Sequence, residues 1–464
     1  MNLHKSVRPP NTIKALDTKQ EEYMQCCDKV WSHDPYRYNL NSEKAYQFMY
    51  HQAFWKKKPR GGNKKTLYSG DYFDHDVYKT TVPSGENPTW ADIPKVDNPV
   101  GVSTFQQCKA CLRAIYKDQT VRRVISIHWE GIWTEAFEDL EKHVKERVPQ
   151  AKRASYQEKA SGEFAPYAVA ERFDEIEEAL WLSSFSPSNR SVNTTLRHRY
   201  ALLHSTTGIL WCESLCRAEL SDFLGLRVPK KDKDVHPMFI MINQIEVGKT
   251  THGRTQCGRV TRHKNVNLCS VGALSFYLQY RFYNTREFHD FNVDDWLDNR
   301  KWFDVKLLAD LVGEAREAMG NDSYSDKIKA ILKALGLPCG DLLHLGRKLG
   351  SKLLDLLEEE NREIKRMGQW SDGIWEGSYS SKLPFGPMRK LAGYSSSNDF
   401  YYNTRTTIDP DEALLYATPI GEWVYQALVD VGEVVVETGK HGTAMQVLRF
   451  LQSSTRCFYK MLQL

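Results

Sequence analysis

The sequence has no long hydrophobic run. None of its windows approaches the roughly 18 apolar residues that a membrane-spanning helix needs. The N-terminal stretch MNLHKSVRPPN lacks the apolar core of a signal peptide. We therefore expect an intracellular protein without a membrane partner. A chain of 464 residues is longer than a single hydrophobic core ordinarily organises, and this length favours two or three domains.

The cysteines do not follow a disulfide or zinc-finger pattern. The 10 cysteines are scattered along the chain, which suits reduced, buried thiols. Cys108 and Cys111 form a CxxC pair within a stretch of helical apolar periodicity, and no second pair stands at zinc-finger spacing. We expect no metal site and no cofactor.

The sequence also lacks a large excess of positive or negative residues. The net charge of +4 is too small to identify a nucleic-acid partner, but the basic residues are clustered. No acidic residue interrupts residues 51–70 or 248–264. The first cluster, the basic arm, comprises Lys56, Lys57, Lys58, Arg60, Lys64 and Lys65, and the second comprises Lys249, Arg254, Arg259, Arg262 and Lys264. A DNA-tracking arm and a solvated loop remain equal alternatives for the first.

Apolar periodicity predicts about four helices before residue 150. One of them begins near Ser103, whose hydroxyl fits a capping box with Gln106. Residues 56–98 are rich in Lys, Gly, Pro and Asp without a sustained period, so we expect a loop or arm there. Residues 145–166 combine charge with Ala, Ser, Gly and two prolines, and they favour a linker.

The second half of the chain mixes helices with one hairpin. Residues 238–247 are β-rich, and a second short strand is expected near residues 259–263. Further helices are expected at about residues 271–283, 305–319, 325–335, 342–357, 412–429 and 442–462. The last two either pack on the body of the protein or pair with another chain.

His344 and Arg347 are three residues apart at the start of the amphipathic run 344–357. On a helix, positions i and i+3 share a face. An imidazole beside a guanidinium can donate two hydrogen bonds to one phosphodiester. A structural hydrogen-bonded pair is the alternative.

These residues resemble an active-site box. His-x-x-Arg at 344–347, Gly-x-Trp at 368–370 and then Tyr379 resemble the second box of the tyrosine recombinases, in which a tyrosine attacks a DNA phosphate. The frame of the first box is matched by Thr207, Gly208, Glu213, Leu220 and Asp222. The position of its catalytic arginine falls on Leu210 or Trp211.

Four further stretches resemble the fungal branch of this superfamily, which holds crypton-type recombinases and a centromere-binding inner-kinetochore subunit of budding yeast. They are GKTTHGR, TRHKNV, CSVGALSFYLQYRF and SYSSKLPFGPMRKLAGY. The resemblance implies a mainly α fold with a small β-hairpin or sheet. It also implies a helical core-binding-like domain at 1–150 with the basic arm at 56–98, a linker at 151–166, a catalytic-like domain at 167–395 and a helical C-terminal segment at 396–464.

The resemblance also implies a chemistry, and the sequence departs from it. A recombinase uses a tyrosine nucleophile, two arginines on the phosphate oxygens, a lysine acid, and His or Trp. The matching positions are Lys249, His344, Arg347, Trp370 and Tyr379. Losing one preorganised cation costs on the order of 3 to 4 kcal/mol of transition-state stabilisation. We expect no catalysis.

Duplex affinity survives such a loss, because it comes from many phosphate contacts and their released counterions. We therefore expect double-stranded DNA binding without catalysis; an active recombinase and a transcription regulator are the alternatives. The expected DNA-contacting residues are Lys56, Lys57, Lys58, Arg60, Lys64, Lys65, Lys249, Arg254, Arg262, His263, Lys264, His344, Arg347, Lys348 and Tyr379. The resemblance further implies a nuclear, centromeric location with kinetochore partner subunits, and leaves a homodimer open.

Overall fold

The computed structural model divides the chain into two compact units, Met1–Gln157 and Glu158–Leu464. It describes residues 10–54, 101–154, 165–183, 189–230, 234–245, 256–309, 315–337, 342–370, 383–394 and 401–462. The division lies within the stretch expected to be a linker. Helix α6 extends to Ala154, beyond the expected start of that linker.

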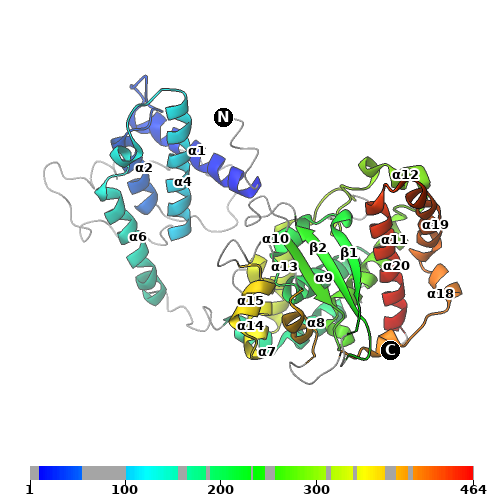
Figure 1. The fold of residues 1–464 in the computed structure, drawn as a ribbon. Helices are drawn as coiled ribbons and strands as arrows, with labels where there is room; N and C mark the ends of the chain where they lie inside the picture. The colour runs from blue at the N-terminus through cyan, green and yellow to red at the C-terminus, as the bar shows by residue number, and fades with distance from the viewer. Residues whose placement is uncertain are drawn as a thin grey trace. The chain divides into compact units, whose positions relative to one another are not determined.

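The first unit is a helical bundle with its own core (Figure 1). Its described helices are α1 Pro10–Val30, α2 Ser42–Phe54, α4 Val102–Val121, α5 Trp129–Ile132 and α6 Glu135–Ala154. Helix α4 packs against α1, α2 and α6, and its buried residues include Phe105, Cys108, Leu112 and Ile115. Cys108 and Cys111 are core residues, and burial raises the pKa of Cys108 to about 12. Among the described residues, no group of three or more metal-ligating side chains occurs.

The capping box predicted at Ser103 is wrong. Helix α4 begins at Val102, and Gly101 occupies its N-cap position without a side-chain cap. Gln106 instead donates a hydrogen bond from Nε2 to Glu141 Oε1 on α6, at 2.8 Å. The amide therefore joins two helices of the core rather than the first turn of its own.

In the second unit, helices surround a small sheet. Its described helices are α7 Ala165–Glu171, α8 Phe173–Leu182, α9 Asn189–Thr207, α10 Cys212–Arg217, α11 Ser270–Thr285, α12 Val293–Leu297, α13 Asn321–Ala334, α14 Leu345–Leu356, α15 Asn361–Met367, α17 Phe385–Leu391, α18 Glu412–Tyr416, α19 Gly421–Thr438 and α20 Gly442–Leu462. Helix α9 is nearly all buried from Asn193 onward and packs against α8, α11 and α14. Within the described part of the chain, no helix is long and apolar enough to cross a membrane.

The sheet has three antiparallel strands in the order β1-β2-β3. Strands β2, Met238–Ile245, and β3, Gln256–Thr261, form the predicted hairpin. Strand β1, Phe223–Val228, was not predicted; it pairs with β2, with Arg227 opposite Phe239. The predicted fold class, mainly α with a small sheet, is confirmed.

The helix predicted at residues 305–319 is wrong. The described parts of this stretch form β-bridges, Glu219 with Lys306 and Ala309 with Ala318. The backbone N–H of Leu307 donates to Ala218 O at 2.9 Å. The apolar spacing of this stretch is helical, but its backbone pairs both within the stretch and with the distant residues Ala218 and Glu219. That pairing overrides local propensity.

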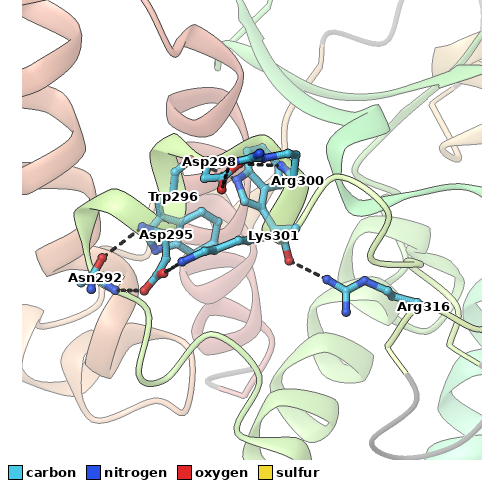
Figure 2. Close-up of polar contacts among 8 residues, drawn as sticks. Asn292, Asp295, Trp296, Asp298, Arg300, Lys301 and Arg316 are labelled. Carbon is cyan, nitrogen blue, oxygen red and sulfur yellow. Dashed lines mark hydrogen bonds and ion pairs between the residues drawn. The ribbon is translucent and has the colours of Figure 1, made fainter.

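The segment that follows α11 contains α12, which packs against α19. Figure 2 shows the polar contacts among its residues. Asn292 caps α12, accepting from the backbone N–H of Asp295 at 3.0 Å, and Asp295 in turn accepts from that of Asn292 at 2.9 Å. Asp295 also forms an ion pair with Lys301. These contacts hold Trp296, which is buried against Trp302. The backbone oxygen of Trp296 accepts a hydrogen bond from the indole N–H of Trp302 at 3.0 Å.

The C-terminal helices pack on the body of the second unit. Helix α20 lies along β1 and α11 and beside α19 (Figure 1). Val447, Leu448 and Leu451 belong to the same core as the residues of α9 and α11. Of the two alternatives for this segment, the structure therefore shows the first, and α20 spans the residues predicted for it.

Helix α14 approaches α9 closely because two glycines face it. A Cβ added at Gly346 would lie 2.0 Å from Ser205 Oγ, and one at Gly350 would lie 2.1 Å from the backbone oxygen of Thr206. Of the predicted apolar stripe on α14, Leu349 and Leu354 are buried, whereas Leu356 and Leu357 are exposed. The two glycines therefore set how closely α14 approaches α9.

We expect Gly350→Ala to lower the free energy of unfolding by about 1–3 kcal/mol, because the backbone of α9 must move to admit the methyl group. Urea denaturation of the second unit's core measures this. Gly442→Ala is the matched control, since a Cβ there meets nothing within 4 Å. An unchanged midpoint for Gly350→Ala would contradict the close packing of α9 and α14.

Candidate nucleic-acid interface

Four residues from three segments meet at the start of α14. His344 is the N-cap residue of that helix, and its ring lies 4.1 Å from that of Trp211, edge to face. The guanidinium of Arg347 lies 5.1 Å from the Trp211 ring and 4.6 Å from the Trp370 ring. The structure therefore brings together His344, Arg347 and Trp370 as the second box predicted, and adds Trp211 from the first.

Arg347 is held by neutral acceptors. Its Nη1 donates to Ile209 O at 2.8 Å and its Nη2 to Gly368 O at 2.5 Å. Burial lowers the pKa of Arg347 to about 10, so the guanidinium remains protonated at neutral pH. Two carbonyls and two ring faces orient the charge without neutralising it, which leaves it able to attract an anion.

The turn after α15 ties this group to the sheet. A Cβ at Gly368 would lie 2.7 Å from the Trp370 ring, so glycine is needed for the ring to reach Arg347. Gln369 has φ 55°, in the left-handed region, and its side-chain amide bonds both backbone groups of Cys257. These two hydrogen bonds join strand β3 to the segment of the second box.

Neither of the two residues at the position expected for the first-box arginine carries a charge. Leu210 is buried and faces β3, where a Cβ on Gly258 would lie 2.5 Å from its Cδ1. Trp211 is the N-cap residue of α10 and contacts the second box. Arg217, at the end of α10, pairs with Glu213 at 3.0 Å.

The other described candidates are Lys348, which follows Arg347 on α14, and Arg262, His263 and Lys264, which follow β3. Lys348 and Lys264 are exposed, and His263 is half-buried. Burial lowers the pKa of His263 to about 4, so its imidazole is neutral at physiological pH and can offer DNA a hydrogen bond but no charge. Arg262 is 7% exposed, with its guanidinium 5.1 Å from the Phe239 ring.

The remaining predicted residues lie outside the described part of the chain. They are the basic arm, Lys249, Arg254 and Tyr379. Sequence reasoning missed the contacts of Trp211 with His344 and Arg347. The signal was present, because Trp211 occupies one of the two positions at which the first box places its arginine.

A family model described as "Centromere DNA-binding protein complex CBF3 subunit, domain 2" matches residues 1–418. The chain belongs to this family. The prediction from the sequence motifs is thereby confirmed. A comparison with curated proteins finds no match.

Among solved structures, an FLP recombinase–Holliday junction complex matches with a TM-score of 0.36, 11% identity, 74% of this chain and 78% of that one. A Flpe–Holliday junction complex matches with a TM-score of 0.39, 11% identity, 96% of this chain and 97% of that one. The assignment to the CBF3 subunit family rests on the sequence match.

We expect Arg347→Lys to lower the free energy of unfolding by about 1–3 kcal/mol, although charge is kept. A compact ammonium cannot donate to both carbonyls and stack between two indoles. Chemical denaturation with tryptophan fluorescence measures the loss, and Arg300→Lys serves as the control because its side chain is 90% exposed. Equal stability of both variants would mean that the two carbonyl hydrogen bonds do not hold Arg347.

Proposed function

We propose that this protein binds double-stranded DNA through the phosphate backbone, without catalysis, at the centromere, and serves as a platform for kinetochore assembly in the nucleus. Membership of the CBF3 subunit family supports DNA binding and the centromeric location. The protein would contact the backbone chiefly, and phosphate contacts set position rather than sequence. Partner subunits would then supply base readout.

The position of Trp211 is the observation that supports binding without catalysis. The indole lies against both His344 and Arg347, and neither it nor the adjacent Leu210 supplies a charge. A phosphorane transition state needs more cationic stabilisation than a bound phosphodiester. The group around Arg347 is thus suited to holding a phosphate and lacks one donor for cleaving it.

We expect Arg347→Ala, and separately Lys249→Ala, to weaken binding of unrelated duplexes alike. Each removes one phosphate contact, so the slope of log K against log salt should flatten by about one unit. Fluorescence anisotropy with several duplexes at stepped salt concentrations measures both quantities, with Arg300→Ala as the control. A loss confined to one DNA sequence would favour base readout instead.

An active tyrosine recombinase is the second candidate, because His344, Arg347 and Trp370 do meet as a recombinase box would require. A duplex with a suicide nick traps any covalent tyrosine adduct. We expect none from the unmodified protein, and none from Trp211→Arg or Leu210→Arg, because attack requires placement within about half an ångström.

Tyr379→Phe is the control for that assay. An adduct formed by the unmodified protein and lost in Tyr379→Phe would refute the non-catalytic proposal. An adduct that appears only after the arginine is restored would show that the other catalytic groups remain in register.

A further inference from the structure

Four cationic side chains meet at one end of the sheet, remote in sequence from the second box. In the antiparallel register, Arg227 on β1 lies opposite Phe239 on β2, and Ile240 lies opposite Thr261 on β3. The next residue after Thr261, Arg262, therefore continues this row beside Phe239. Its guanidinium lies 5.1 Å from the Phe239 ring.

Helix α20 brings two more cations to the same end. It lies along β1, and the rings of Phe223 and Phe450 are 5.8 Å apart. Alternation along β1 puts Arg227 on the same face as Phe223. Arg227 lies four residues after Phe223 on β1, and Arg456 and Lys460 lie six and ten residues after Phe450 on α20. Each of these separations corresponds to roughly 9 to 15 Å along the strand or the helix. Arg456 and Lys460 accordingly reach the vicinity of Arg227.

The electrostatics agree with this placement. Burial lowers the pKa of Lys460 to about 8, and the positive charge of Arg262 acts in the same direction, followed by those of Arg227 and Arg456. Asp409 acts in the opposite direction, but it forms no ion pair with Lys460. Three positive charges that act on one lysine in this way create a strongly positive local potential.

The cluster has unused hydrogen-bond donors. Within the described residues, the side chains of Arg227, Arg262, Arg456 and Lys460 make no hydrogen bond or ion pair. Arg262 is 7% exposed, and its Nε is enclosed without an acceptor; Nε of Arg456 is likewise enclosed without one. A nearly buried guanidinium that no described side chain pairs, beside three other cations, is costly unless an anion completes it.

We propose that Arg227, Arg262, Arg456 and Lys460 form an anion site that binds a phosphate group of duplex DNA, separate from the group around Arg347. The identity of the ligand rests on the proposed function. Cys257, which bonds Gln369, and Arg262 are five residues apart, or roughly 16 Å along β3. A duplex, whose major groove alone is about 12 Å wide, is large enough to contact two sites at such a separation.

The test compares full-length R227Q/K460Q with the charge-keeping R227K/K460R, by anisotropy with a mixed-sequence duplex at stepped salt concentrations. We expect R227Q/K460Q to bind severalfold more weakly at low salt, with a slope about one unit flatter. The charge-keeping variant should retain the slope. R300Q/R316Q is the matched control, because it also removes two charges, which pair with Asp298 and Asp304 at a different place in the unit. Equal thermal midpoints establish that all variants are folded.

Three results would overturn the site, and they are distinguishable from one another. If the unmodified protein shows no salt-dependent duplex binding, the proposed function fails and the phosphate ligand with it. If the unmodified protein binds and Arg347→Ala flattens the slope, but R227Q/K460Q leaves it unchanged, the function stands and the site is refuted. Binding of a polyglutamate peptide lost in R227Q/K460Q while duplex binding is unaffected would assign the cluster to an acidic protein partner instead.

Discussion

A charged guanidinium held by uncharged groups is the interaction on which the candidate interface depends. Arg347 donates to two backbone carbonyls, one before α10 and one after α15, and lies against two indoles. These contacts join the segments of both boxes at one point. Because none of the four contacts cancels the charge, the same residue can organise the fold and still attract a phosphate.

Binding and cleavage make different demands on such a group. Affinity for a duplex is distributed over many phosphate contacts, so the loss of one cation lowers it by a modest factor. Cleavage depends on several charges placed around one phosphorus atom, so the loss of one costs orders of magnitude in rate. A scaffold with Trp211 beside Arg347 can therefore keep the first function without the second.

Several sequence predictions succeeded where a local pattern and tertiary packing agree. The helix at residues 442–462 and the hairpin of β2 and β3 follow from apolar periodicity and β-branched content. The helix expected at residues 305–319 and the cap at Ser103 failed. In both, a partner distant in sequence, Ala218 for Leu307 and Glu141 for Gln106, took the hydrogen bond that the local pattern had assigned.

The sequence by itself determined the spacing of His344 and Arg347, the uncharged residues at the arginine position and the family, because each of these lies within a short stretch of chain. Only the tertiary structure decided that Trp211 contacts both residues of the second box. It also decided that Arg227, Arg262, Arg456 and Lys460 share one end of the sheet. The reason is that strand pairing and helix packing bring together residues as far apart as Arg227 and Lys460, 233 positions. A pattern within one short stretch does not show which distant side chains will touch.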